Sequence, residues 1–143
     1  MIEFIKKAIT SVDGIKDFKF YDDYMANKEG GEINYPCAIL EPIEAVRYER
    51  NGAYIRDKMN IILTIADIAP FDYDGQTLYN INHRCAELMI QVLQNLQVRT
   101  TFDKEVDVNT LVPMGDEFLC GAMINLQVTA KQPRCAPNPT IKE

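Results

Sequence analysis

The chain of 143 residues has one histidine, no Cys-x-x-Cys pair and no long hydrophobic run. No apolar stretch approaches the ~18 residues of a transmembrane helix, and the segment 1–7 lacks the basic-then-apolar order of a secretory signal. We therefore expect a protein that folds in the cytoplasm and does not enter a membrane. Basic residues are also fewer than acidic ones, 15 against 21, which gives a net charge of −6. This balance argues against general or sequence-specific nucleic-acid binding, which requires a clustered basic face.

The spacing of the four cysteines does not predict a metal site. Cys37, Cys85, Cys120 and Cys135 lie 48, 35 and 15 residues apart, whereas a structural zinc site usually takes two ligands from one tight turn. His83 precedes Cys85 by two positions in a segment with helical periodicity, and residues two apart on a helix face different directions. We expect no metal and no other cofactor. Cys37, Cys85 and Cys120 are predicted to be small core residues, and Cys135 to be exposed.

Groups able to carry out catalysis are scarce. The sequence contains no G-x-x-x-x-G-K, G-x-G-x-x-G or G-x-S-x-G motif. Carboxylates gather at Asp22-Asp23 and at Asp72 with Asp74, but neither group has the ligand ladder of a calcium loop. We predict no catalytic residue. The alternative is a small ligand-binding or enzymatic α+β domain with a pocket between a long helix and a sheet, where His83 would act with a loop carboxylate.

The length is that of one domain, and hydrophobic periodicity predicts its elements. The pattern predicts a helix over 2–12, a strand or extended segment over 15–21, a mobile loop over 27–32, β-rich runs over 37–49 and 53–68, a long helix over 78–96, strands over 110–114 and 118–131 with a turn at 115–116 between them, and a Pro-rich arm over 132–143. This order predicts an α+β fold: a mainly antiparallel sheet with a long β-hairpin, packed on one face by a long helix and a short N-terminal helix. We expect a single domain over 1–131, and an arm that joins no sheet interior.

The strongest local signal is the Asn51-Gly52 dipeptide between the two β-rich runs. It tolerates the positive φ angles of a two-residue type I′ turn and so predicts a hairpin. With those two residues as the whole loop, the register places three apolar pairs on one face: Ala38 with Ile65, Leu40 with Leu63, and Pro42 with Ile61.

Toward its turn the predicted hairpin becomes polar, charged and aromatic. Tyr and Arg provide large contact areas at modest entropic cost, so we predict that the tip projects beyond the core and forms an interface. The candidate interface residues are Arg47, Tyr48, Arg50, Asn51, Gly52, Tyr54 and Arg56. The alternative is that Arg47, Arg50 and Arg56 form ordinary charge pairs with Glu49 and Asp57 on a solvated ribbon.

This layout resembles that of the tail terminator, or tail completion, proteins of long-tailed bacteriophages. The segments that carry the resemblance are Tyr35-Pro36-Cys37-Ala38-Ile39-Leu40, the Asn51-Gly52 hairpin, the strand that ends at Ile65-Ala66-Asp67, and the closing strand that runs up to Lys131-Gln132-Pro133. The resemblance covers most of residues 1–131 and rests on element order rather than on an invariant motif. Head-to-tail neck proteins share the same layout.

The resemblance implies a non-enzymatic structural protein of a phage or prophage virion, located in the tail or neck and assembled in the host cytoplasm. Such proteins form a ring, commonly of six subunits, that caps the finished tail tube, ends its growth and offers a docking surface to the head connector. The implied partners are further copies of the chain, the tail-tube protein and the head-tail connector protein. A head-tail neck adaptor of the same fold is the alternative role.

Overall fold

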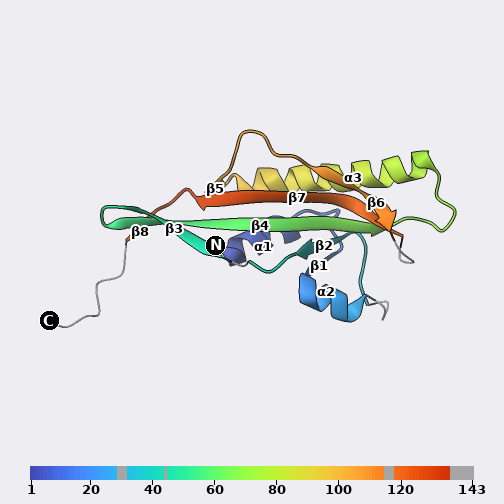
Figure 1. The fold of residues 1–143 in the computed structure, drawn as a ribbon, viewed down its shortest axis with the longest axis horizontal. Helices are drawn as coiled ribbons and strands as arrows, with labels where there is room; N and C mark the ends of the chain where they lie inside the picture. The colour runs from blue at the N-terminus through green and yellow to red at the C-terminus, as the bar shows by residue number, and fades with distance from the viewer. Residues whose placement is uncertain (29–31, 44, 115–117, 136–143) are drawn as a thin grey trace.

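The computed structural model shows one elongated sheet with helices on both faces, and it describes residues 1–28, 32–43, 45–114 and 118–135 (Figure 1). The elements are α1 (Ile2–Thr10), β1 (Asp17–Phe20), α2 (Tyr21–Asn27), β2 (Cys37–Leu40), β3 (Val46–Asn51), β4 (Tyr54–Ile68), α3 (Gly75–Leu96), β5 (Thr100–Thr101), β6 (Asn109–Met114), β7 (Leu119–Ala130) and β8 (Arg134–Cys135). The mainly antiparallel sheet, its long hairpin and the packing of α1 and α3 confirm the predicted α+β fold.

Strand β4 is the axis of the sheet. Along one edge its residues Tyr54–Met59 pair with β3 and Leu63–Ala66 with β2, and along the other edge Lys58–Ile68 pair with β7. The strand order is β1-β2-β4-β7-β5, and β6 also pairs with β7. Strands β1 and β2 are parallel, while the other pairs among the described strands are antiparallel. Because β4 is so long, one end of the sheet continues past the helices that cover its middle.

Helices α1 and α3 cover one face of the sheet and form the main core with it. α3 begins at Gly75, three residues earlier than the periodicity predicted, because the Asp74 side chain caps it by accepting the Thr77 N–H at 2.7 Å. Its buried residues recur at three- and four-residue spacing and pack on alternate residues of β4 and β7. The buried side chains of this core include Ile5, Ile9, Ile61, Leu63, Ile65, Met89, Val92, Leu96, Ile124 and Val128.

Helix α2 was not predicted. The sequence indicated an extended segment up to Tyr21, but β1 ends at Phe20 and Tyr21 begins a helix of seven residues. Asp22 and Asp23 lie in its first turn, where carboxylates stabilise the N-terminus of a helix. α2 packs on the face opposite α1 and α3 and covers one end of the sheet. A second, smaller apolar cluster lies there, formed by Tyr24, Ile33, Cys37, Ile39 and Ala66.

The hairpin register is as predicted at its base and different at its tip. Ala38 pairs with Ile65 and Leu40 with Leu63, as expected. At the tip, however, the turn consists of Gly52 and Ala53, and Asn51 pairs with Tyr54, so the prediction of an Asn51-Gly52 turn is wrong. Gly52 has a φ of 63° and Ala53 has no positive φ, the pattern of a type II′ turn rather than a type I′ turn.

The registers of β2 and β3 on β4 differ by two residues, so the shift arises between the end of β2 at Leu40 and the start of β3 at Val46. The Glu41 N–H still donates to the Ile62 carbonyl at 3.0 Å, but Pro42 lies outside the strands, so its predicted pairing with Ile61 does not form. A shift of two residues keeps each side chain on the same face of the sheet, because strand side chains alternate with a period of two. The prediction that the apolar residues at the base of the hairpin share one face is therefore confirmed: Ala38, Leu40, Ile61, Leu63 and Ile65 all lie in the main core.

The segment after β7 is partly in the sheet. Strand β8 pairs with Tyr54 and Ile55, beyond the point where β7 leaves β4, at the projecting end of the hairpin and not in the sheet interior. The predicted arm over 132–143 made no allowance for this strand, and its residues 136–143 lie outside the described residues. The same holds for residues 29–31 of the predicted loop and for the predicted turn at 115–116. No helix among the described residues is long and apolar enough to cross a membrane.

Candidate interaction surface

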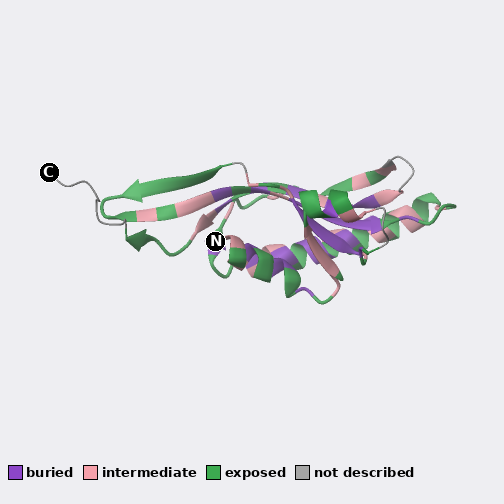
Figure 2. Ribbon diagram, turned by 90° about the horizontal axis from the view of Figure 1, so that it is seen from below, coloured by how far each residue is buried: buried purple, intermediate pink, exposed green. Residues whose placement is uncertain are grey.

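The hairpin of β3 and β4 extends past the helices, as the sequence predicted (Figure 2). Met59 is the last buried residue of β4 in the direction of the turn, and all six residues of β3 are exposed. Two large aromatic side chains of the hairpin are also exposed: Tyr48 in β3 is 57% exposed, and Tyr54 at the start of β4 is 53% exposed. The tip is thus a ribbon with solvent on both faces, and its role as an interface stays a prediction.

The candidate interface residues lie together at the tip but divide between its two faces. Because side chains alternate along a strand, Tyr48 and Arg50 share the side of Met59, the side on which α1 and α3 lie further along the sheet. We call this the helix-side face. The opposite, open face of the tip carries Arg47, Asn51, Tyr54 and Arg56, while Gly52 lies in the turn.

The two carboxylates of the tip are paired, but with cations that the sequence had not indicated. On the helix-side face, Arg134 of β8 donates from Nε to Asp57 at 3.2 Å. On the open face, Lys58 Nζ lies 2.7 Å from Glu49 Oε2, and this hydrogen bond lowers the pKa of the Glu49 carboxyl. Solvent surrounds both pairs, so each adds little to stability.

These pairings leave the three predicted arginines of the tip available. Arg56 lies directly opposite Glu49 and its charge also lowers the pKa of that carboxyl, but the ion pair goes to Lys58. Within the described chain, Arg47, Arg50 and Arg56 have no ion-pair partner. The expectation that they form charge pairs with Glu49 and Asp57 is therefore wrong, and their guanidinium donors are free to bind another molecule.

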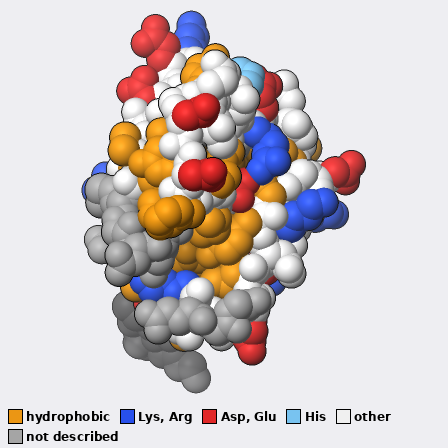
Figure 3. Space-filling model, turned by 90° about the vertical axis from the view of Figure 1, so that its right-hand side faces the viewer, with side chains coloured by type: hydrophobic (Ala, Val, Ile, Leu, Met, Phe, Trp, Pro, Cys, Tyr) orange, Lys and Arg blue, Asp and Glu red, His pale blue; other side chains and the backbone are white. Residues whose placement is uncertain are grey.

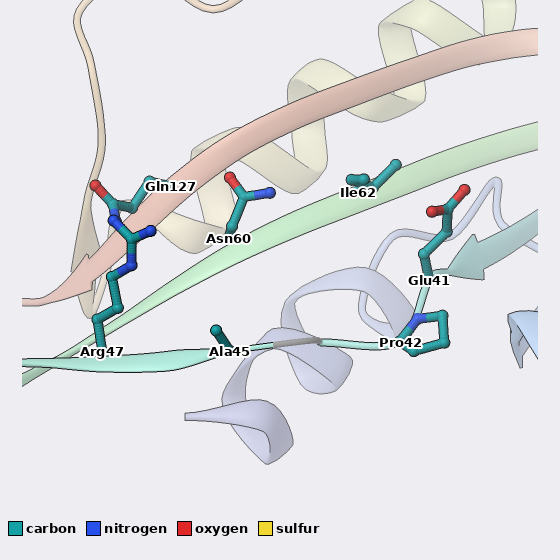
Figure 4. Close-up of a pocket in the computed structure, with 7 residues that line it drawn as sticks. All are labelled: Glu41, Pro42, Ala45, Arg47, Asn60, Ile62 and Gln127. Carbon is teal, nitrogen blue, oxygen red and sulfur yellow. The ribbon is translucent and has the colours of Figure 1, made fainter.

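A hollow of about 520 Å³ lies on the open face where the hairpin register shifts (Figure 4). It forms because the chain between β2 and β3 leaves the edge of β4 there. Glu41 and Arg47 stand at opposite ends of it, with Asn60 and Ile62 of β4 between them. The complete lining is Glu41, Pro42, Ala45, Arg47, Asn60, Ile62 and Gln127.

A second hollow, of about 390 Å³, adjoins the first and shares Asn60 and Gln127 with it. Its outer wall is the segment 102–108 between β5 and β6. Apolar residues of this segment, among them Val106, pack on the main core, and the intervening carboxylates stay exposed. We call this hollow the acidic groove; it is bordered by Asp103, Glu105, Asp107, Asn60, Asn109, Asn125 and Gln127. The groove was not predicted from the sequence, where three acidic residues at alternate positions, 103, 105 and 107, were its only signal.

The end of the sheet opposite the hairpin tip carries an exposed aromatic cluster. Phe71 is 87% exposed, and its ring packs edge-on against Phe118 with centroids 5.8 Å apart. Tyr73 contacts the same Phe118 ring at 6.1 Å. Figure 3 looks at this end and shows hydrophobic side chains gathered on its surface with acidic ones among them. The elongated molecule therefore has exposed basic and aromatic side chains at the hairpin tip and an exposed aromatic cluster at its other end.

Titratable groups do not gather into a reaction centre among the described residues. His83 is exposed on α3, where it stacks on Tyr79 and lies 3.6 Å from Glu87, so it does not face a pocket between the helix and the sheet. Arg84 pairs with Asp67, which is 8% exposed. Nowhere in the described chain do three His, Cys, Asp or Glu side chains lie close enough together to hold a metal ion.

The cysteines lie as predicted, with Cys37, Cys85 and Cys120 buried and Cys135 exposed. Burial raises the pKa of the Cys37 and Cys85 thiols to about 12 and that of Cys120 to about 11. The charge of Asp67 adds to the effect on Cys85 and Cys120. The three thiols are therefore protonated at neutral pH and act as core residues rather than as nucleophiles.

Comparison with known proteins adds no family to this description. No protein-family model matches the chain, and no curated protein matches it either.

Proposed function

We propose that the protein is a structural subunit of a phage or prophage virion, of the tail terminator type. It assembles with further copies of itself into a ring, commonly of six subunits in the proteins it resembles, that caps the tail tube and joins it to the head-tail connector. Under this proposal it acts by contact alone, without catalysis and without a cofactor. The related role of a head-tail neck adaptor would use the same surfaces with a different order of partners.

The projecting hairpin is the observation that carries this proposal. From Val46 to the turn the ribbon is exposed on both faces, so it adds nothing to the hydrophobic core. It presents unpaired arginines and two tyrosines to solvent instead. Arg and Tyr are the side chains enriched in the energetically dominant parts of protein interfaces. A second molecule is the natural partner for such a surface.

The aromatic cluster at the other end supports a role between two partners. Phe71, Tyr73 and Phe118 expose apolar area at the end of the molecule remote from the hairpin tip. Exposed apolar patches on soluble proteins commonly mark contact sites. A subunit of a capping ring needs one surface for its neighbours and another for the tube or the connector, and the two ends of this molecule are available for them.

Capping of purified tail tubes tests the proposal. Tail-tube protein polymerised with the present protein should give tubes of limited length that each carry a ring of it at one end, visible by negative-stain electron microscopy. The connector protein should then bind to the ring and not to bare tubes. Tubes that continue to grow, together with a protein that stays monomeric at rising concentration, would contradict the proposed function. Binding of the connector without any effect on tubes would favour the neck adaptor.

A further inference from the structure

The charge of the hairpin tip is opposite to that of the rest of the chain. Residues 46–58 together with Arg134 contain five cations and two carboxylates, a net charge of +3, so the remainder of the chain carries −9 of the total of −6. Because the two signs lie on different parts of one molecule, two copies have complementary surfaces. The positive tip of one copy is attracted to the negative surface of another copy, whereas two tips, or two negative surfaces, repel each other.

The acidic groove is a part of the remaining surface where three carboxylates gather beside a hollow. Asp103, Glu105 and Asp107 border it, and none of them forms an ion pair with a described cation. Two amide side chains project into the groove from its sheet wall, where Asn60 Nδ2 donates to Asn125 Oδ1 at 3.1 Å and the Asn60 side-chain oxygen is left as an acceptor. Carboxylate and amide oxygens are the acceptors that an arginine fork recognises.

We propose that the open face of one copy's hairpin tip docks on the acidic groove of a second copy, with Arg47 and Arg56 directed at Asp103, Glu105 and Asp107. Tyr54, on the same face of the tip, adds apolar contact area beside the arginines. This contact specifies how neighbouring subunits of the proposed ring would meet, and it therefore rests on the proposed function.

The groove cannot be filled by Arg56 of its own chain. Arg56 lies four residues before Asn60 on β4, roughly 13 Å along an extended strand. Asn60 is at the near margin of the groove, and β4 runs straight from there into the hairpin, which points away from the groove. The pairing of β3 and β8 with β4 holds the ribbon in that direction. Arg47 of the same chain lines the adjoining hollow with Asn60 and Gln127 but forms no ion pair with Asp103, Glu105 or Asp107, so these carboxylates remain available to the arginines of a second copy.

A tip-to-groove contact joins two different surfaces, so each subunit retains a free tip and a free groove after the first contact. Such head-to-tail contacts build a ring when the rotation between neighbours closes and a filament when it does not. The contact consists largely of exposed charges, whose attraction salt screens at separations beyond the Debye length, about 10 Å at 0.1 M and about 3 Å at 1 M. Self-association through it should therefore weaken as the salt concentration rises.

Two variants test the proposal by sedimentation velocity, and each lacks the charged side chains of one side of the contact; we call them blinded. The blinded-tip variant carries Arg47→Ala and Arg56→Ala, and the blinded-groove variant carries Asp103→Asn, Glu105→Gln and Asp107→Asn. Each alone should associate about tenfold or more weakly than the wild type. Mixed in equal amounts, they should form a dimer of one copy of each and nothing larger, since one intact tip and one intact groove remain between them.

Matched controls carry the same change of charge outside the proposed contact. Lys16→Ala with Lys131→Ala removes two exposed cations, as the blinded-tip variant does, and Asp13→Asn with Asp22→Asn and Asp23→Asn removes three exposed carboxylates, as the blinded-groove variant does. Both control proteins should associate like the wild type. Raising the NaCl concentration from about 50 mM to about 500 mM should weaken wild-type association several-fold and leave the blinded-groove variant nearly unaffected.

The outcomes separate this contact from the proposed function. A wild type that forms rings and caps tail tubes, with blinded variants that assemble equally well, overturns the tip-to-groove contact and leaves the proposed function intact. A mixture of the two variants that stays monomeric, or an equal loss of association in the charge-matched controls, likewise overturns it. A wild type that neither self-associates nor caps tubes overturns the contact and the proposed function together.

Discussion

Arg134 in β8 lies over the ring of Tyr48 in β3, with its guanidinium carbon 5.5 Å from the ring centroid, while its Nε donates to Asp57. These contacts join the chain that follows β7 to both strands of the hairpin. The pairing of β8 with Tyr54 and Ile55 adds backbone hydrogen bonds at the same place. The projecting ribbon is thus three strands wide where β8 reaches it, and it is stiffer there than a two-stranded hairpin.

Arg134→Ala should loosen β8 without unfolding the domain. An exposed cation–π contact and an exposed ion pair together contribute below about 1.5 kcal/mol, so the free energy of unfolding should fall only slightly. Amide hydrogen exchange of residues 54–55 and 134–135 should become faster, while exchange within the β4–β7 pairing stays slow. Lys131→Ala, which changes a nearby exposed cation, serves as the control. Unchanged exchange at 134–135 would show that the Arg134 side chain does not hold β8.

Gly121 is required where β7 meets β4. Its φ is 136°, and a Cβ at this position would collide with the carbonyl oxygen of Ile65. Its N–H also donates to the buried Asn82 side chain at 2.9 Å, and that side chain donates to the Leu111 carbonyl at 3.0 Å. Glycine thus allows β7 to lie against β4 on one side and to bond to α3 through Asn82.

Gly121→Ala should therefore lower the free energy of unfolding by about 3 kcal/mol or more, since it combines an unfavourable φ with a backbone clash. Gly75→Ala is the matched control, because a Cβ there has no neighbour within 4 Å and lies in the first turn of α3. It should be neutral or stabilising by up to about 1 kcal/mol. Urea denaturation of both proteins measures the difference. Equal midpoints would contradict the close approach of β7 to β4.

Because of its buried thiols, the protein should have a lower free energy of unfolding at alkaline pH. In the folded protein the pKa of Cys85 is raised to about 12, from 9.0 for an unperturbed thiol, so the folded state keeps its proton at a pH where the unfolded state releases it. The contribution of the buried, protonated Cys85 thiol to the free energy of unfolding is fully present below pH 9 and is lost as the pH rises from about 9 toward 12. At pH 10 each such thiol should cost about 1 kcal/mol of stability relative to pH 7.

A pair of alanine variants isolates this effect. Urea midpoints measured between pH 7 and pH 10.5 should fall less steeply for Cys85→Ala than for the wild type, because one of the buried thiols is gone. Cys135→Ala changes an exposed cysteine and should leave the slope unchanged. Parallel slopes for all three proteins would mean that other groups account for the alkaline loss.

Much of the fold follows from periodicity, and the differences have local physical causes. Alternation fixed the faces of β4 and β7, and helical spacing identified α3, because burial of an apolar face decides both patterns. The tip register could not be predicted, because Gly52 can take a positive φ either as the second residue of an Asn51-Gly52 turn or as the first residue of a Gly52-Ala53 turn. The choice between them is linked to a register shift between Leu40 and Val46, remote from the turn. The short α2 was missed because Phe18, Phe20 and Tyr21 have the aromatic character of a strand.

The candidate site divides in the same way. The arginines and tyrosines of the tip could be found because they interrupt an apolar alternation within one hairpin. The acidic groove could not be located, since it depends on how the segment 102–108 lies against β7. That placement is set by Phe102, Val106 and Val108, which pack on the main core from outside any regular strand. The pairing of Asp57 with Arg134 likewise requires contact between residues 77 positions apart.

The two ends of the molecule should respond differently to substitution. Arg50→Ala with Tyr54→Ala removes one contact side chain from each face of the hairpin tip, so it tests the tip whichever face a partner uses. Phe71→Ser removes the most exposed ring of the opposite end. Because all three side chains are exposed, both proteins should unfold within about 0.5 kcal/mol of the wild type.

Their binding properties are what should separate them. The tip variant should lose self-association, because a ring contact through the hairpin depends on Tyr54, whereas Phe71→Ser should still self-associate and bind the tail tube or the connector more weakly. Sedimentation and a tube-capping assay on the same preparations measure the two properties independently. If Phe71→Ser abolishes self-association and the tip variant retains it, the ends have the opposite assignment, and the hairpin faces the tube or connector rather than a neighbouring subunit. A large loss of stability in the tip variant with assembly intact would instead assign the hairpin residues to the fold.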